Sequence, residues 1–109
     1  MELTNIPFAT TDWSKIPTAK HTGETGEALW RVVDLGCVRV RMIEYSANYK
    51  ADHWCKRGHI LLVLEGELVT ELEDGRVFTL QAGQSYQVQH DGEAHRSSTA
   101  LGAKLFVVD

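Results

Sequence analysis

Short apolar runs separated by glycine-containing turns fill the second half of the chain, and they constrain its fold most strongly. Residues 59–64 form a continuous apolar run, which is typical of a buried strand. Residues 67–73 alternate between Leu or Thr and Glu or Val, which indicates a strand with one buried face. We expect Glu65-Gly66-Glu67, which lies between these two runs, to form a tight turn.

Further turn signals continue this pattern toward residue 109. Asp74-Gly75 is a strong hairpin signal, after which residues 76–80 return as a strand. A turn at residues 82–84 precedes a second alternating segment at residues 85–89, and residues 103–108 form a last apolar strand. The second half is therefore predicted to be entirely β-structure.

The first half is less regular and contains two clear strand candidates, residues 29–34 and 37–45. Residues 1–28 contain both prolines of the chain, and we interpret them as an N-terminal arm with a strand or two. A short helical turn is expected at residues 11–14, capped by Thr11 or Asp12. The arm belongs to the same domain as the barrel that we expect over residues 29–109.

The size of the chain favours closure of these strands into a barrel. The 109 residues suffice for one domain with one core. A small β-domain with open apolar edges would aggregate, and a jelly-roll barrel protects such edges. We therefore predict an all-β, single-domain barrel.

Charge and hydropathy exclude several classes of partner. The net charge of −4 argues against a nucleic-acid partner, which requires a basic face. No apolar run approaches the roughly 20 residues that span a bilayer, so no membrane partner is expected. The first residues lack the features of a signal peptide, so we expect a cytoplasmic protein with Cys37 and Cys55 as free thiols.

Metal-ligating side chains cluster in one short stretch. His53, Cys55 and His59 lie within seven residues, and His95 follows a glycine-rich turn further along. In an extended strand residues i and i+2 share a face, so His53 and Cys55 would project together. Convergent imidazole and thiolate groups are the ligands that borderline transition metals prefer.

The spacing of these residues resembles the two motifs of the cupin superfamily. His53, Cys55, His59 and Gly66 are spaced like the first motif, with Cys55 in the place of a second His and His59 in the place of a Glu. Gly83, Gly92 and His95 are similar to the second motif, with one extra residue between the first two. The resemblance covers about residues 37–109. More narrowly, the chain looks like the small single-domain cupins named for an Asp-His-Cys-Trp motif, although residues 52–55 here read Asp-His-Trp-Cys.

The resemblance implies a cupin-type jelly-roll barrel that holds one divalent metal at one end. The implied ligands are His53, Cys55, His59 and His95, with Zn²⁺ as the first choice and Fe²⁺ or Ni²⁺ as alternatives. A Cys55 thiolate would restore the negative charge that is lost when His59 replaces a Glu. Asp52 is a candidate to orient a ligating histidine, and Tyr86 is a candidate pocket residue.

Each of these residues also has a purely structural interpretation. Cys55 can serve as a small buried apolar residue, and the histidines can pack or lie at the surface. Tyr86 can simply pack in the core. Arg39 and Arg41 are expected to face solvent or a partner subunit.

Three functions are compatible with the sequence. The first is a metal-dependent enzyme of dioxygenase, isomerase or hydrolase type that acts on a small polar molecule. The second is a non-catalytic barrel that binds a ligand or a protein through a closed metal site, and the third is a metal-free structural barrel. The resemblance also implies a homodimer, because small cupins commonly pair through an N-terminal strand.

Overall fold

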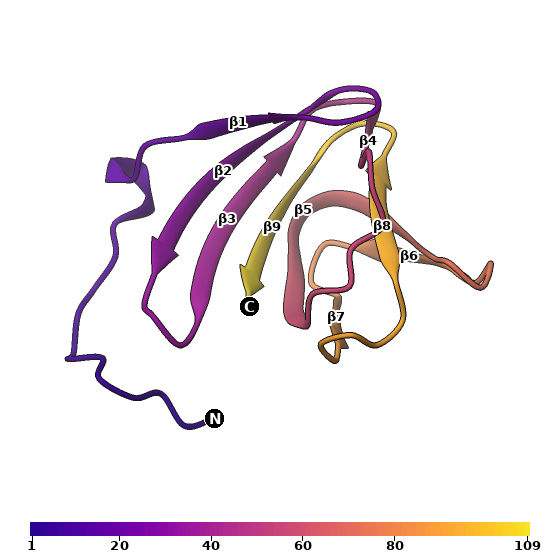
Figure 1. Cartoon of the computed structure of the whole chain (residues 1–109). Helices are drawn as coiled ribbons and strands as arrows, with labels where there is room; N and C mark the ends of the chain where they lie inside the picture. The colour runs from indigo at the N-terminus through magenta and orange to yellow at the C-terminus, as the bar shows by residue number, and fades with distance from the viewer.

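The computed structural model describes residues 1–109 and consists of strands, loops and one short helical turn (Figure 1). The elements in chain order are the 3-10 helix η1 (Trp13–Lys15) and the strands β1 (Ala19–Thr22), β2 (Glu27–Asp34), β3 (Arg39–Tyr45), β4 (Tyr49–Lys50), β5 (His59–Leu72), β6 (Val77–Gln81), β7 (Ser85–Val88), β8 (His95–Thr99) and β9 (Ala103–Val108). No helix is both long and apolar enough to cross a membrane.

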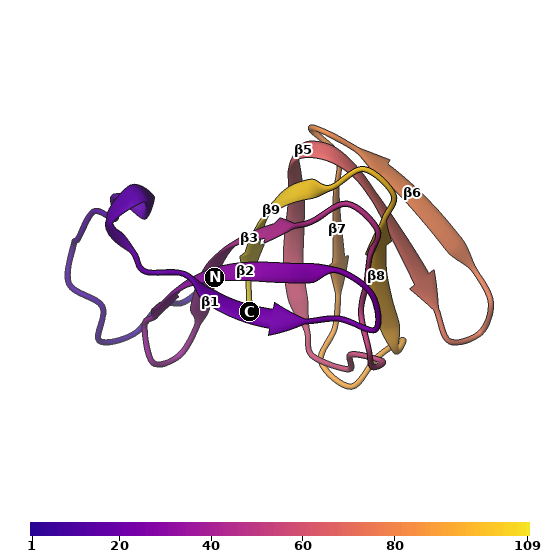
Figure 2. The same cartoon turned by 90° about the horizontal axis from the view of Figure 1, so that it is seen from above.

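The strands form two layers that face each other (Figures 1 and 2). Hydrogen bonding runs in the order β1-β2-β3-β9-β5-β8-β4, and β6 and β7 also pair with β5. All these pairs are antiparallel. The first half of β5 pairs with β9 and β7, and its second half pairs with β6 and β8. The predicted all-β fold is confirmed, and β5 connects its two layers.

The prediction of a tight turn at Glu65-Gly66-Glu67 is wrong. Strand β5 runs through these residues as one strand of 14 residues. The strand bends there instead of ending. Its pairing with β9 shifts register between Val63 and Glu65, and Gly66 has a φ of 80°. A β-bulge and a glycine with positive φ bend a strand without breaking its pairing, so one strand serves both layers.

Other local predictions are confirmed. The Asp74-Gly75 turn joins β5 to β6, and Gly75 has the positive φ, 99°, that such a turn requires. Strand β9 covers residues 103–108 as predicted. Asp12 caps η1 by accepting a hydrogen bond from the backbone N–H of Ser14. The N-terminal arm contributes β1, which pairs with β2.

The core lies between the two layers. Alternate residues of β9 and β5 point inward, and the largest fully buried side chains are Leu68, Leu105, Val63 and Val107. Tyr45, Tyr49, Trp30 and Tyr86 pack against this core. The polar residues of the candidate site also lie between the two layers, at one end of this apolar core.

Candidate metal centre

Backbone hydrogen bonds place Cys55 beside His95. The backbone N–H of Cys55 donates to the carbonyl of His95 at 2.7 Å, and the N–H of His95 donates to the carbonyl of Cys55 at 3.0 Å. This isolated bridge fastens the loop of residues 51–58 to the start of β8. His59 follows the loop as the first residue of β5. Residues far apart in the sequence therefore meet at one end of the barrel.

The ligand atoms of Cys55, His59 and His95 all lie within 4.8 Å of one another. The Nε2 atoms of His59 and His95 are 3.2 Å apart. Two nitrogens bound to one tetrahedral zinc, with Zn–N bonds of about 2.0–2.1 Å, would be separated by about 3.3 Å. The spacing of the two imidazoles therefore fits a shared metal ion.

Hydrogen bonding sets the tautomer of His95. Its Nδ1 lies 2.9 Å from the carbonyl oxygen of Glu93, an acceptor, so Nδ1 carries the proton. The lone pair of Nε2 then points toward the cluster. Metal-binding histidines commonly donate their second N–H in this way, and this contact is a further sign that His95 suits a metal.

The electrostatic environment shifts Cys55 and His59 toward the forms that bind metals, whereas the hydrogen bond with Cys55 raises the pKa of His95 and favours its protonated form. A hydrogen bond with His95 and another from the backbone N–H of Arg57, 3.4 Å from Sγ, lower the pKa of the Cys55 thiol against the opposing effect of burial. Burial and the charge of His95 lower the pKa of His59 to about 4, so its imidazole is neutral at neutral pH. A thiol that ionises readily and a neutral imidazole are the states that coordinate a metal.

Tyr86, predicted as a pocket residue, contacts the cluster directly. Its hydroxyl lies 2.9 Å from Nε2 of His59. Burial raises the pKa of Tyr86, so the hydroxyl stays protonated. The hydroxyl of Tyr86 would therefore compete with a metal for the lone pair of this Nε2 atom.

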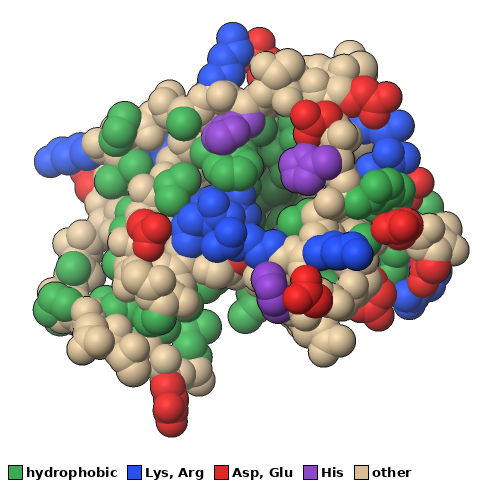
Figure 3. Space-filling model, viewed as in Figure 1, with side chains coloured by type: hydrophobic (Ala, Val, Ile, Leu, Met, Phe, Trp, Pro, Cys, Tyr) green, Lys and Arg blue, Asp and Glu red, His purple; other side chains and the backbone are tan.

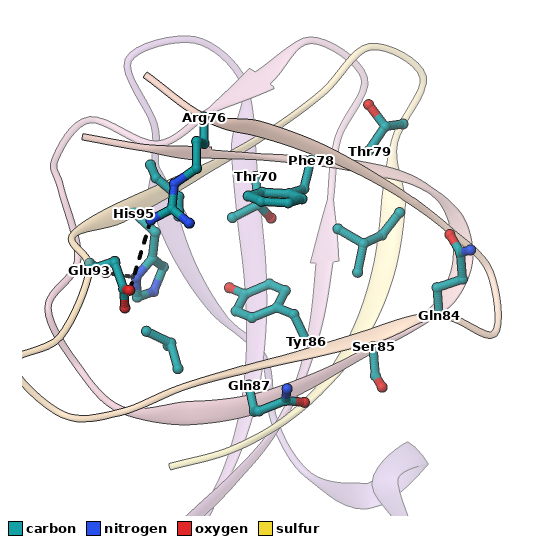
Figure 4. Close-up of a pocket in the computed structure, with 13 residues that line it drawn as sticks. Thr70, Arg76, Phe78, Thr79, Gln84, Ser85, Tyr86, Gln87, Glu93 and His95 are labelled. Atoms are coloured by element: carbon teal, nitrogen blue, oxygen red, sulfur yellow. Dashed lines mark hydrogen bonds and ion pairs between the residues drawn. The ribbon is translucent and has the colours of Figure 1, made fainter. Parts of the chain in front are cut away.

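A cavity of about 690 Å³ opens beside the cluster and is bordered by Tyr86 and His95. Thr70, Phe78 and Tyr86 point into it between β6 and β7 (Figure 4). The hydroxyl of Thr70 is buried and has no hydrogen-bond partner. The cavity has room for a small ligand and offers it a free hydroxyl next to the histidines. Thr70 was not among the predicted site residues. The signal was its spacing of two residues from Leu68 and from Leu72, which places it on their face of the strand.

His53 lies outside the cluster. Its side chain is 74% exposed, and its Nδ1 lies 2.7 Å from Oδ1 of Asp52. The prediction that His53 and Cys55 share a face assumed an extended strand, whereas residues 51–58 form a loop with a single bridge. Asp52 orients His53, as a partner of a ligating histidine would, but no contact links the pair to the other three. The place of His53 as a fourth ligand stays a prediction.

The expectation that Arg39 and Arg41 face solvent or a partner is wrong for Arg41, which is 6% exposed. Both guanidinium groups bind the fully buried carboxylate of Asp109, Arg39 at 3.0 Å and Arg41 at 2.9 Å. Arg57 joins them at 3.2 Å. We call these three residues with Asp109 the arginine cluster. The alternation of Arg39, Arg41 and Ile43 along one face of β3 was the signal in the sequence that could have revealed it.

The fold matches solved structures of cupins over most of its length. A predicted oxalate decarboxylase from Thermotoga maritima aligns with a TM-score of 0.78 and 16% identity, covering 92% of this chain and 96% of that one. Ectoine synthase from P. lautus aligns with a TM-score of 0.75 and 15% identity, covering 93% and 76%. A cupin-2 domain protein from Shewanella frigidimarina aligns with a TM-score of 0.60 and 20% identity, covering 73% and 78%.

No protein-family model matches the chain, and no curated protein matches it in sequence. The structural likeness nevertheless extends over both layers of the barrel. At these identities the likeness establishes the fold and leaves the reaction open.

Proposed function

We propose that this cupin-fold chain binds one divalent transition metal through Cys55, His59 and His95 and acts there on a small polar molecule. The observation that carries the proposal is the convergence of these three ligand atoms within 4.8 Å of one another beside a cavity of about 690 Å³. A metal ligand set and a ligand-sized cavity that share His95 are the features expected of a metal-dependent enzyme.

The number of ligands favours a catalytic site over a structural one. Structural zinc sites have four protein ligands, whereas catalytic sites have three and leave one position for water or substrate. The cluster supplies three, and His53 points instead to Asp52 at the surface. The alternative, a closed and non-catalytic site, requires the loop of residues 51–58 to bring His53 inward.

The donor set favours Zn²⁺, which accepts nitrogen and thiolate ligands in tetrahedral geometry. Fe²⁺ and Ni²⁺ are the alternatives, because imidazole suits both ions. A bound ion of this kind would supply Lewis acidity to an oxygen of the ligand or of water. Among the chain's own groups, the protonated hydroxyl of Tyr86 and the free hydroxyl of Thr70 would orient the ligand by hydrogen bonds.

The test is metal analysis of untagged protein after chelation and reloading with Zn²⁺. We expect one equivalent in the wild type and a dissociation constant raised by about 100-fold or more in Cys55→Ser and in His95→Gln. His90→Gln is the matched control, because the side chain of His90 is 74% exposed and lies outside the cluster. Circular dichroism confirms that each variant is folded.

Two outcomes would contradict the proposal. Zinc binding that is unchanged in both cluster variants would place the metal elsewhere. A folded wild type that binds no zinc, iron or nickel, and whose melting temperature does not rise with any of them, would make the barrel a metal-free structural or ligand-binding domain.

A further inference from the structure

Strand register places the arginine cluster in the same row as His59. Ile60 of β5 pairs with Val108 of β9, and Val108 pairs with Val40 of β3. One residue along, His59, Asp109 and Arg39 therefore lie side by side on three adjacent strands. Neighbouring residues in such a row project to the same face, so all three side chains point into the space between the layers.

The position of these residues on adjacent strands sets the distance between the arginine cluster and the candidate metal centre. Adjacent strands are about 4.8 Å apart, so the backbone of Asp109 lies about 5 Å from that of His59, and that of Arg39 lies about 10 Å away. Arg57 links the two groups of residues. It lies two residues from both Cys55 and His59 in the sequence, and its guanidinium binds Asp109. This backbone spacing is short enough that one small molecule could reach from the arginines to the Cys55, His59 and His95 cluster.

The arginine cluster carries more positive charge than it can neutralise. Three guanidinium groups share one carboxylate, and Asp109 is the only acidic residue within ion-pair distance of any of them. Two positive charges are thus left in excess, in a chain whose net charge is −4. In addition, Nε of Arg41 is buried and has no hydrogen-bond partner. Buried or half-buried cations normally have a partner for each charge.

Several contacts hold the arginine cluster in place, and its members differ in exposure. The guanidinium of Arg41 lies over the ring of Trp30 at 4.5 Å, and Asp109 fixes both Arg39 and Arg41. The exposed fraction of the side chain rises from 8% in Arg41 to 22% in Arg39 and 51% in Arg57. In the space-filling view, Lys and Arg side chains border a hollow in the surface of the molecule (Figure 3). The outer N–H groups of Arg39 and Arg57 can therefore meet a ligand.

We propose that the arginine cluster is an anion subsite and that the small molecule bound at this centre is a short organic carboxylic acid. The inference rests on the proposed metal-dependent function for the second contact. Arg39 and Arg57 would bind the carboxylate through their outer N–H groups, because the planar guanidinium fork matches a carboxylate, as Asp109 already demonstrates. A second oxygen of the acid would then face the Cys55, His59 and His95 cluster.

The test is calorimetric titration with malonate and succinate, with malonamide and succinamide as uncharged ligands of matched size. We expect one-to-one binding of at least one acid and none of the amides. Arg57→Gln should weaken binding by about tenfold or more, which is the loss of one charge-assisted hydrogen bond. Arg57 is the most exposed member of the cluster, so this variant is expected to fold. Lys104→Gln is the control, because the side chain of Lys104 is similarly exposed, at 47%, and pairs with Glu65 away from the arginine cluster and the cavity.

Comparing metal-free and zinc-loaded protein separates this inference from the metal proposal. Acid binding that depends on Arg57 in the metal-free protein supports the subsite even if no zinc binds. Zinc binding without binding of either acid would overturn the subsite alone. Acid binding that is equal in wild type and Arg57→Gln, or equal for acids and amides, would also overturn it and make the arginine cluster a purely structural ion network.

Discussion

The Nε2 atoms of His59 and His95 face each other at 3.2 Å, although 36 residues separate them in the sequence. β5 supplies one and β8 the other, and the Cys55 bridge brings the thiol to the same point. The hydroxyl of Tyr86 is the remaining neighbour of His59 Nε2. Two nitrogens and a sulfur therefore converge on one small volume at the end of the barrel.

The hydroxyl of Tyr86 competes with a metal for His59, so we expect Tyr86→Phe to raise zinc affinity. The variant removes a hydrogen bond worth about 0.5–1.5 kcal/mol, which corresponds to about 2- to 10-fold in affinity. Competition with a chelating dye would measure the dissociation constant. A weaker affinity in Tyr86→Phe would show instead that the hydroxyl supports the bound metal. Ser85→Ala, on the same strand, serves as a control.

We expect Asp109→Asn to destabilise the fold by about 3 kcal/mol at neutral pH, because it leaves the buried guanidinium of Arg41 without a counter-charge. Urea unfolding would measure the loss. Glu65→Gln is the control, because Glu65 forms an exposed ion pair with Lys104 that is worth less than about 1 kcal/mol. A loss no larger than that of the control would show that the arginine cluster does not stabilise the fold.

The contribution of Asp109 should also depend on pH. Burial alone would raise the pKa of its carboxyl, but the hydrogen bond from Arg39 and the charges of Arg41 and Arg39 outweigh burial and hold the pKa below its ordinary value. This stabilisation is fully present above the unfolded pKa of about 3.9 and is lost as the pH falls through the lower native pKa. The unfolding free energy of the wild type should therefore fall below about pH 4, and Asp109→Asn should lack this part of the decrease. Parallel curves for the two proteins would contradict the assignment.

Gly66 should tolerate substitution far less well than Gly75. Both have positive φ, 80° and 99°, but a Cβ at Gly66 would collide with the backbone of Gly102 and Ala103, whereas a Cβ at Gly75 would meet nothing within 4 Å. We expect Gly66→Ala to cost at least about 3 kcal/mol and Gly75→Ala about 1 kcal/mol, because only the first adds a steric clash to backbone strain. Equal costs, measured by urea unfolding, would mean that the bend of β5 does not depend on close packing against β9.

The sequence allowed much of the fold to be predicted, because local patterns dictate it. The hairpin at Asp74-Gly75 and the strand of residues 103–108 follow from turn chemistry and apolar content, and both are present. The path of β5 through Gly66 could not be predicted, because a glycine with positive φ suits both a turn and a bulge. Pairing with β9, a long-range contact, decides between them.

Only part of the candidate site could be predicted, because the rest depends on loop conformation and on contacts between residues far apart in the sequence. Cys55, His59, His95 and Tyr86 come together as expected, but the position of His53 depends on a loop conformation that strand alternation does not describe. The arginine cluster depends on Asp109, which is 68 residues from Arg41 in the sequence. The homodimer expected through residues 1–28 stays a prediction, and the mass of the protein in solution at micromolar concentration would check it.

The measurement that tests the central claim most directly is X-ray absorption at the metal edge of the zinc-loaded protein. We predict a first shell with one sulfur at about 2.3 Å, two imidazole nitrogens at about 2.0–2.1 Å and one further light atom from water or ligand. The sulfur should disappear in Cys55→Ser. A shell without sulfur in the wild type would contradict the Cys55, His59 and His95 centre, and three imidazoles with one sulfur would mean that His53 moves inward and closes the site.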